Sequence, residues 1–114
     1  MRKFETGATR DDEDGKFDYE GFYDPLVLQA FASYMHGHRK QPDGTMRSGD
    51  NWQRGFPLDV YMKSMLRHVM DMWIIHRGHV AARPEDGKTV TLDEALGGIL
   101  FNVQGYWSSI LKDE

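Results

Sequence analysis

The chain has 114 residues, of which 39% are hydrophobic and 12% aromatic. This composition is typical of one globular domain that is large enough to bury a core. The 14 basic and 18 acidic side chains give a net charge of −4, which disfavours a nucleic-acid binder because that class carries a basic surplus. Cysteine is absent, so disulfides and thiolate metal sites are excluded. No apolar run approaches the roughly 18 residues of a membrane span, and the amino-terminal segment lacks an apolar signal, so we expect a cytoplasmic protein with no membrane partner.

Residues 1–23 are predicted to form an irregular arm ahead of a helical body that spans residues 24–114. The arm carries an acidic cluster that is typical of a solvated segment: Asp11, Asp12, Glu13 and Asp14. Four aromatic residues at its end predict that this end packs on the body: Phe17, Tyr19, Phe22 and Tyr23. Lys16, together with Arg10, is a candidate for closing over a bound anion.

The first helix is predicted to begin at Asp24 and Pro25, which are typical N-cap and first-turn residues, and to run to about Arg39. Near its end, His36 and His38 are two residues apart, so their rings would point in different directions on a helix. This spacing favours a surface or capping role over a metal site. Residues 41–50 carry turn-forming residues and predict a loop.

The central helix is predicted to begin at Pro57 and to end at Gly78, after a polar loop. One apolar stripe at three- and four-residue spacing is expected to pack on the body: Leu58, Met62, Leu66, Val69 and Trp73. Other positions of the same helix carry His, Asp, Lys and Arg. The helix is therefore expected to pack on the body through its apolar stripe and to carry functional side chains at its other positions.

A connector over residues 79–90 is expected to face solvent, and the last helix opens with a capping box formed by Thr91 and Glu94. Its expected buried stripe consists of Leu92, Leu96, Ile99, Val103, Tyr106 and Ile110. Three glycines inside the helix each cost up to about 1 kcal/mol relative to alanine, which predicts close approach of another backbone or a ligand: Gly97, Gly98 and Gly105.

No strand pattern is present, so the predicted fold is all-α, a small bundle of three main helices in one domain. If the last two helices are antiparallel, Asp71 and Glu94 meet across the pair. Two facing carboxylates would suit Mg²⁺, which also bridges to substrate phosphates. Asp93 is a neighbouring candidate ligand, and the alternative for Glu94 is a purely capping role.

His68 lies three residues before Asp71, so the two side chains are neighbours on one helix. The pair could hold a cation or relay a proton. The structural alternative is a half-buried His68 that donates a hydrogen bond to Asp71, with Arg67 pairing to the same carboxylate.

A nucleotide-sized site is predicted around Trp52, whose ring could stack on a base, and Asn51, whose amide could read the base edge. Nearby cations would meet the phosphates: Arg39, Lys40, Arg54, Lys63 and Arg67. Asn102, in the middle of the last helix, would face the base or sugar, or would bond a neighbouring helix. Trp52 as a plain core residue remains the alternative.

These residues carry a family resemblance. The segment Asn51-Trp52-x-x-Gly55, then Arg67-His68, then an aliphatic helix with Asn102, resembles the small dATP/dGTP diphosphohydrolase-like proteins common in phages. The amino-terminal segment from Thr6 to Asp11, with Lys16, resembles the arm of those proteins. They are similar to the MazG-like, all-α nucleoside triphosphate pyrophosphohydrolases.

The resemblance implies a helical homo-oligomer that uses Mg²⁺ or Mn²⁺ to cut a purine (deoxy)nucleoside triphosphate into the (deoxy)nucleoside monophosphate and pyrophosphate. It departs from the family where an acidic Glu-x-x-Glu or Glu-x-x-Asp cluster would follow the Arg-His helix, because this chain has His76-Arg-Gly-His79 there. The acidic candidates are then limited to Asp71, Asp93 and Glu94, with Glu85 and Asp86 in the connector.

The predicted mechanism places Mg²⁺ on Asp71 and Glu94, with His68 as a helper base or as the residue that orients Asp71. Lys63 and Arg67 would offset charge on the phosphates. The alternative from another class is a non-catalytic helical phage protein that binds a partner protein or a nucleotide, for which seven methionines would supply an adaptable surface.

Overall fold

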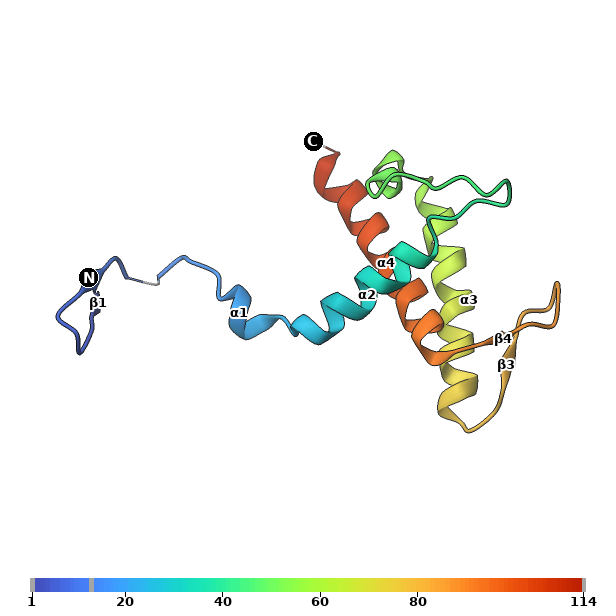
Figure 1. The fold of residues 1–114 in the computed structure, drawn as a ribbon, viewed down its shortest axis with the longest axis horizontal. Coiled ribbons are helices and arrows are strands. Elements are labelled where there is room, and N and C mark those ends of the chain that lie inside the picture. Colours follow the sequence, from blue (N-terminus) through green and yellow to red (C-terminus); the bar gives the residue numbers. More distant parts are fainter. Residues whose placement is uncertain (1, 13, 114) are drawn as a thin grey trace.

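A computed structural model describes residues 2–12 and 14–113 and is built mainly of helices (Figure 1). The helices are α1 (Tyr19–Phe22), α2 (Pro25–Gly37), the 3₁₀ helix η1 (Asn51–Arg54), α3 (Leu58–His76) and α4 (Leu92–Lys112). Two antiparallel hairpins pair β1 (Arg2–Lys3) with β2 (Thr9–Arg10) and β3 (Ala81–Ala82) with β4 (Thr89–Val90). The predicted mainly helical class is confirmed. The hairpins were not predicted, because strands of two residues leave no alternating pattern.

The helix ends follow the local signals in the sequence. The Asp24 carboxylate accepts a hydrogen bond from the Leu26 N–H at 2.9 Å, and the Thr91 hydroxyl accepts one from the Glu94 N–H at 3.1 Å. Both bonds satisfy N–H groups that an α-helix leaves without an internal partner. Gly78 follows the end of α3 with a φ of +86°, a conformation that costs glycine little. Helix α2 ends at Gly37, two residues before the predicted end.

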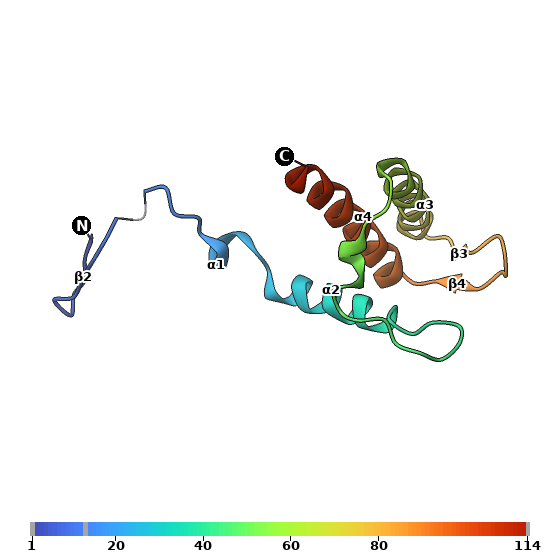
Figure 2. The same ribbon diagram turned by 90° about the horizontal axis from the view of Figure 1, so that it is seen from above.

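Helices α3 and α4 pack antiparallel, and α2 crosses α4 on one side of this pair (Figures 1 and 2). The contacts between α3 and α4 keep a constant register. The rings of Tyr61 and His68 lie against Gly105 and Gly98, and between them the Asn102 amide donates to the Ser64 hydroxyl at 3.3 Å. From Tyr61 to His68 the residue number rises along α3, while the number of the contacted residue on α4 falls by the same amount, from Gly105 to Gly98. This is the pattern of antiparallel packing.

The glycines of α4 explain how closely these elements approach. A Cβ at Gly98 would stand 2.6 Å from three atoms of the His68 ring, so the imidazole lies face-on against the helix backbone. A Cβ at Gly97 would collide with the ring of Tyr34 from α2. The predicted close approach at these positions is therefore made by aromatic side chains, rather than by a backbone or a ligand.

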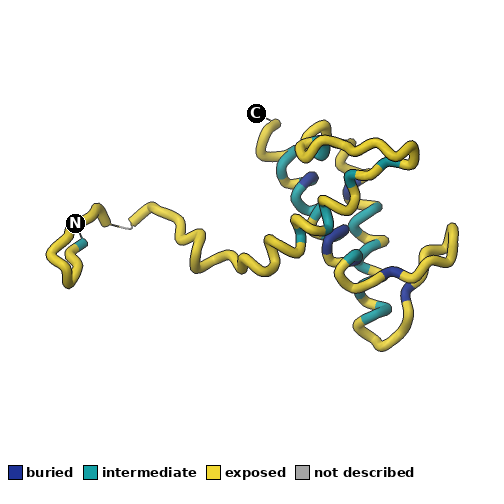
Figure 3. The backbone as a smooth tube through the Cα atoms, in the orientation of Figure 1, coloured by how far each residue is buried: buried dark blue, intermediate teal, exposed yellow. Residues whose placement is uncertain are grey.

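The apolar stripes predicted to be buried are largely exposed (Figure 3). On α3, Leu58, Met62, Leu66 and Trp73 are exposed, and on α4 so are Leu92, Leu96 and Ile110. The buried residues of α4 are instead small or polar: Ala95, Gly97, Gly98, Asn102 and Gly105. This corrects the prediction. The small residues admit neighbouring rings, and the large aliphatic side chains point outward.

The connector also differs from its prediction, because both of its strands enter the core. Ala81 of β3 and Val90 of β4 are buried and form a cluster with Ala95 at the start of α4. Partly buried side chains from the end of α3 pack against this cluster: Met72, Ile74 and Ile75. The expectation that residues 79–90 face solvent is correct for the turn between the strands and wrong for the strands themselves.

The arm extends away from the helical body (Figures 1 and 2). Phe17 is 75% and Phe22 76% exposed, so the prediction that these aromatic residues pack on the body is wrong. The rings contact one another instead, with Tyr19 and Tyr23 stacked at a centroid distance of 6.0 Å. The acidic residues 11, 12 and 14 are exposed, as predicted, while Glu13 lies outside the described residues. The radius of gyration of 19.2 Å exceeds the roughly 13 Å of a compact chain this long.

Candidate functional site

Two cavities adjoin each other on the side of the α3–α4 pair that faces α2. The smaller, of about 430 Å³, is lined by α2, α3, the start of α4 and the β3–β4 hairpin. The larger, of about 730 Å³, is lined by the end of α2, the following loop and η1. Tyr34 and His38 belong to the walls of both cavities. The two cavities are therefore neighbours that share an aromatic wall.

The smaller cavity contains three carboxylates, and we call it the carboxylate cavity. Asp71 comes from α3, Glu94 from α4 and Glu85 from the turn of the β3–β4 hairpin. The register between α3 and α4 explains why the first two share a wall, since continuing from the His68–Gly98 contact brings Asp71 alongside the first turn of α4. Asp71 and Glu94 are both half-buried. Arg67 and Arg83 complete the charged lining.

Glu94 is free to face this cavity because its capping role involves only its backbone. The Glu94 N–H donates to Thr91, but among the described residues the Glu94 carboxylate accepts no bond from the Thr91 N–H in return. Burial, and then the negative charge of Glu94, raise the pKa of the Tyr34 hydroxyl above its usual value. The phenol therefore stays protonated at neutral pH, where it can donate a hydrogen bond into the cavity.

His68 is a half-buried titratable group of the carboxylate cavity. Burial lowers the pKa of its imidazole; Asp71 opposes this effect, and Arg67 and His38 add to it. The ring is therefore neutral at pH 7. Its Nδ1 atom is buried and has no hydrogen-bond partner among the described residues, which is uncommon because buried polar atoms are nearly always bonded.

The structural alternative for these side chains is not formed. Among residues 2–12 and 14–113, no hydrogen bond joins His68 to Asp71, and no ion pair joins Arg67 to Asp71. The imidazole, the guanidinium and the carboxylate line one cavity without neutralising one another through direct bonds. All three remain available to a ligand.

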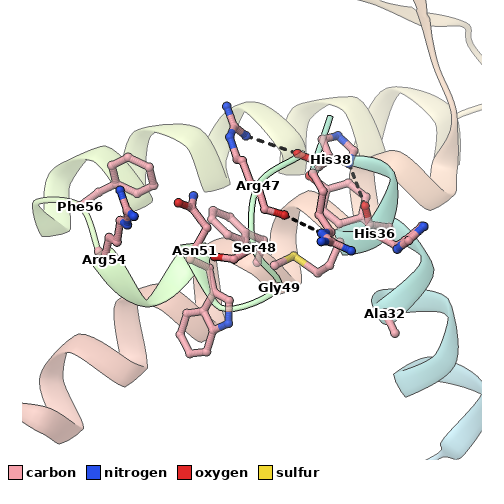
Figure 4. A pocket seen from close by; sticks show the side chains of 15 residues that line it. Ala32, His36, His38, Arg47, Ser48, Gly49, Asn51, Arg54 and Phe56 are labelled. Atoms are coloured by element: carbon pink, nitrogen blue, oxygen red, sulfur yellow. Dashed lines mark hydrogen bonds between the residues drawn. The ribbon is translucent and has the colours of Figure 1, made fainter. Parts of the chain in front are cut away.

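The larger cavity has the opposite charge, and we call it the arginine cavity. Arg39, Arg47 and Arg54 line it, and none of the described residues in its lining carries a carboxylate. The Arg39 guanidinium donates to the Arg47 carbonyl at 2.7 Å, and the Arg47 guanidinium donates to the His38 carbonyl at 3.3 Å (Figure 4). These bonds hold the two sides of the loop together at the cavity wall.

Asn51 and Trp52, from η1, both line the arginine cavity. Both are half-buried. The segment after η1 is fixed because the Phe56 N–H donates to the hydroxyl of the buried Tyr61 at 3.1 Å. Lys112 lies 5.4 Å from the centroid of the Trp52 ring and makes a cation–π contact with it.

Several predicted site residues lie outside both cavities. Lys63 pairs with Asp59 at 3.5 Å on the exposed surface of α3. Lys40 is exposed in the loop after α2, and Lys16 is exposed in the arm. Asp93 is exposed in the first turn of α4, whereas its neighbour Glu94 lines the carboxylate cavity. The structure thus separates these cations and Asp93 from the residues that converge.

Asn102 is used between helices, which is one of the two roles that the sequence left open. It is 2% exposed, and its amide donates to the Gly98 carbonyl at 2.7 Å as well as to Ser64. These bonds satisfy the two N–H groups of the amide, and neither cavity includes the residue. Asn102 therefore stabilises the α3–α4 contact between the two glycines that seat Tyr61 and His68.

Sequence reasoning missed the wall that the cavities share. Tyr34 is not among the site residues that the sequence predicts, and His38 is predicted to lie at a cap or on the surface. His38 does cap α2, since its ring nitrogen is 2.8 Å from the Tyr34 carbonyl, and its ring lies 4.1 Å from the Tyr34 ring. The available signal was the four-residue spacing, which places two such rings on one helix face.

No group of three or more His, Asp or Glu side chains within residues 2–12 and 14–113 is arranged to hold a metal ion. None of the described helices has the length and apolar character needed to cross a membrane. Comparison of the chain with protein-family models, curated proteins and solved structures finds no match.

Proposed function

We propose that this chain is a Mg²⁺-dependent (deoxy)nucleoside triphosphate pyrophosphohydrolase that releases a (deoxy)nucleoside monophosphate and pyrophosphate. The observation that carries this proposal is the adjoining pair of cavities: a carboxylate cavity with Asp71, Glu94 and a neutral His68, and an arginine cavity with Trp52 and Asn51. A nucleotide also has two different ends, a planar base and a phosphate chain that carries a cation. The base would suit the arginine cavity, and the cation-bearing phosphates would suit the carboxylate cavity.

The residues of the carboxylate cavity fit Mg²⁺ as the cofactor, with Mn²⁺ as an equivalent. Asp71 and Glu94 are half-buried, come from different helices and have no ion-pair partner among the described residues. Mg²⁺ is commonly held by only one or two carboxylates, with waters and substrate phosphates as the other ligands. When bound, it would supply Lewis-acid stabilisation to the phosphate oxygens and lower the pKa of a coordinated water.

His68 is the proposed base for the attacking water. Its imidazole is neutral at pH 7 and lines the carboxylate cavity, where it could accept a proton from a water. Gly98 positions the ring by allowing it to lie against the α4 backbone. Arg67, in the same cavity, would stabilise the negative charge that develops on the phosphates. Lys63 is exposed on α3 and lies outside both cavities, so the proposed mechanism gives it no role, in contrast to the prediction from sequence.

The nucleoside is proposed to lie in the arginine cavity. Trp52 would stack on the base and Asn51 would bond its edge, while Arg39, Arg47 and Arg54 attract the polyanionic substrate. The resemblance to the dATP/dGTP diphosphohydrolase-like proteins and to the MazG-like enzymes supports a purine (deoxy)nucleoside triphosphate as the substrate. It also supports a cytoplasmic site of action.

The direct test mixes the full chain with dATP or dGTP and Mg²⁺ and separates the products by ion-exchange chromatography. We expect monophosphate and pyrophosphate in equal amounts, and no diphosphate or free phosphate. Release of phosphate with diphosphate would contradict the proposed position of cleavage. The matched control is the same reaction with EDTA, which should abolish turnover if the carboxylates act through a divalent cation.

The second candidate function is a nucleotide-binding or partner-binding protein without catalysis, favoured by the large exposed apolar surface. A thermal-shift measurement with a non-hydrolysable triphosphate and Mg²⁺ separates the candidates. A ligand present at a hundred times its Kd stabilises the fold by about 2.7 kcal/mol. Stabilisation without turnover would support the binding protein, and the absence of both would exclude the nucleotide altogether.

A further inference from the structure

Tyr34 lies where the two cavities meet. Its side chain belongs to the lining of both the carboxylate cavity and the arginine cavity, and of the described residues only His38 shares this position. The mechanism proposed for the carboxylate cavity uses neither residue. A ligand that extends from one cavity into the other has to pass this wall.

The ring of Tyr34 is held by contacts on several sides. A Cβ at Gly97 would collide with it, so the ring lies against the backbone of α4. The His38 ring is 4.1 Å away and the Phe31 ring is stacked at 6.4 Å, both measured between ring centroids. Because a tyrosine side chain has only two rotatable angles, a fixed ring also fixes the position of its hydroxyl.

The Tyr34 hydroxyl is available to a ligand. The residue is half-buried, and its hydroxyl makes no hydrogen bond with any of the residues that the structure describes. The hydroxyl of Tyr61, by contrast, accepts a hydrogen bond from the Phe56 N–H. A phenol has an ordinary pKa of about 10, so it is protonated at neutral pH and can donate a hydrogen bond. Tyr34 therefore offers a positioned donor between the cavities.

The part of a nucleotide that reaches this wall is its α-phosphate, which links the nucleoside to the other phosphates. With the nucleoside in the arginine cavity and the cation-bearing phosphates in the carboxylate cavity, this link lies between them. We propose that the Tyr34 hydroxyl donates a hydrogen bond to a non-bridging oxygen of the α-phosphate, as a further catalytic residue. This role rests on the proposed function and belongs to the same site.

The hydrogen bond strengthens during the reaction. The attacking water forms a new P–O bond and gives a proton to His68, while the bridging P–O bond between the α- and β-phosphates breaks and its electron pair stays with the departing group. The α-phosphate carries one negative charge in the substrate and two in the monophosphate product. A donor aimed at its oxygens therefore lowers the barrier more than it tightens substrate binding. His68 and Tyr34 lie against the neighbouring Gly98 and Gly97, so one turn of α4 positions both.

Tyr34→Phe tests the role, because it removes the hydroxyl and keeps the ring with its contacts. We expect kcat for dGTP with Mg²⁺ to fall by at least about tenfold, as for a lost hydrogen bond to a charged group, with KM changed only a few-fold. The matched control is Tyr106→Phe, since Tyr106 is half-buried and lines neither cavity. Equal kcat values in the two variants overturn the role of Tyr34, although wild-type turnover would still support the proposed function. A wild type without turnover removes both.

Substrates with one sulfur atom identify the phosphate that Tyr34 contacts. Sulfur accepts hydrogen bonds poorly, so the wild type already lacks the bond when sulfur replaces the contacted oxygen. For one of the two diastereomers of α-thio-dGTP we expect Tyr34→Phe to lower kcat by less than about threefold, because the two changes remove the same contact. γ-Thio-dGTP should show the full loss. A full loss with both α-thio diastereomers overturns the contact with the α-phosphate.

Discussion

The carboxylate cavity and the arginine cavity differ in both charge and construction. The carboxylates Asp71 and Glu94 lie on two long helices whose register is fixed by rings seated on glycines. The arginine cavity is formed largely by a loop and one 3₁₀ turn, held by hydrogen bonds between side chains and backbone. The first cavity is therefore the more precisely positioned of the two.

Under the proposed function, this difference predicts that one cavity performs the chemistry and the other holds the substrate. Groups that take part in bond breaking need positions accurate to a fraction of an ångström, which helices provide better than loops. Groups that only hold a substrate tolerate more movement, and binding residues are often found on loops. Changes in the carboxylate cavity should mainly lower kcat, and changes in the arginine cavity should mainly raise KM.

The largest effect is expected from Asp71→Asn, which keeps the shape of the side chain but removes its charge. We expect kcat to fall by at least about a hundredfold, since a bound cation contributes several kcal/mol to transition-state stabilisation. Steady-state kinetics with dGTP and Mg²⁺ measure this loss. The matched control is Asp59→Asn, an exposed carboxylate on the same helix. An equal loss in both variants, or in neither, would remove the special role of Asp71.

The next effect concerns the contact between the His68 ring and the backbone of α4 at Gly98. In Gly98→Ala the new methyl group must displace the imidazole, because its position is 2.6 Å from three ring atoms. Overpacking of this kind costs about 1–3 kcal/mol, partly offset by the up to about 1 kcal/mol that alanine gains over glycine in a helix. Urea unfolding should show a net loss of stability, and kcat should fall with it.

Gly37→Ala is the control for that variant. Gly37 ends α2, and a Cβ added there meets no atom of the described residues within 4 Å. Its free energy of unfolding should stay within about 0.5 kcal/mol of the wild-type value, as for most surface substitutions. If Gly98→Ala is as stable as Gly37→Ala and fully active, the close contact of the His68 ring with Gly98 is needed neither for stability nor for activity.

A smaller effect is expected in the arginine cavity. Trp52→Ala removes the proposed stacking surface for the base, a contact worth about 1–3 kcal/mol per base. We expect KM to rise by about tenfold or more, with kcat changed only a few-fold. Phe17→Ala, which removes an exposed ring from the arm, should leave both constants unchanged. A fall in kcat with constant KM would show that the two cavities do not divide binding from chemistry.

The ends of the long helices could be predicted from sequence because capping is local. Asp24, Thr91 and Gly78 each act through bonds or backbone angles within one turn. That Asp71 and Glu94 line one cavity followed from one further assumption, that α3 and α4 are antiparallel. The predicted mainly helical class needed only these local signals and the helical spacing of apolar residues.

The buried faces could not be predicted, because periodicity shows that a helix has an apolar side but not what covers it. The stripe with Leu66 and Trp73 was expected inside and is outside, while Gly98 and Gly105 occupy the inside. Small residues carry little weight in an apolar pattern, although they decide how closely two helices approach. The shared wall of Tyr34 and His38 depends on where α2 crosses α4, which is a long-range property.

The smallest predicted effect is a dependence of stability on pH that belongs to His68. Burial lowers the pKa of this imidazole in the folded chain, whereas the unfolded chain has the ordinary value of about 6.5. Between the lowered pKa and about 6.5 the unfolded state binds more protons, so the free energy of unfolding falls as the pH drops through this interval. One such group changes stability by at most about 1.4 kcal/mol per pH unit.

Urea unfolding at pH 7.5 and 5.5, at one protein concentration, measures this dependence. His68→Gln should lose less stability on acidification than the wild type, because the variant has no imidazole to protonate at this position. His79→Gln, which changes an exposed histidine of the connector, should retain the wild-type dependence. If His68→Gln also retained it, the acid sensitivity would belong to other groups. The neutral state of His68, and with it the proposed base, would lose its support, whereas the arginine cavity and its stacking contact would be unaffected.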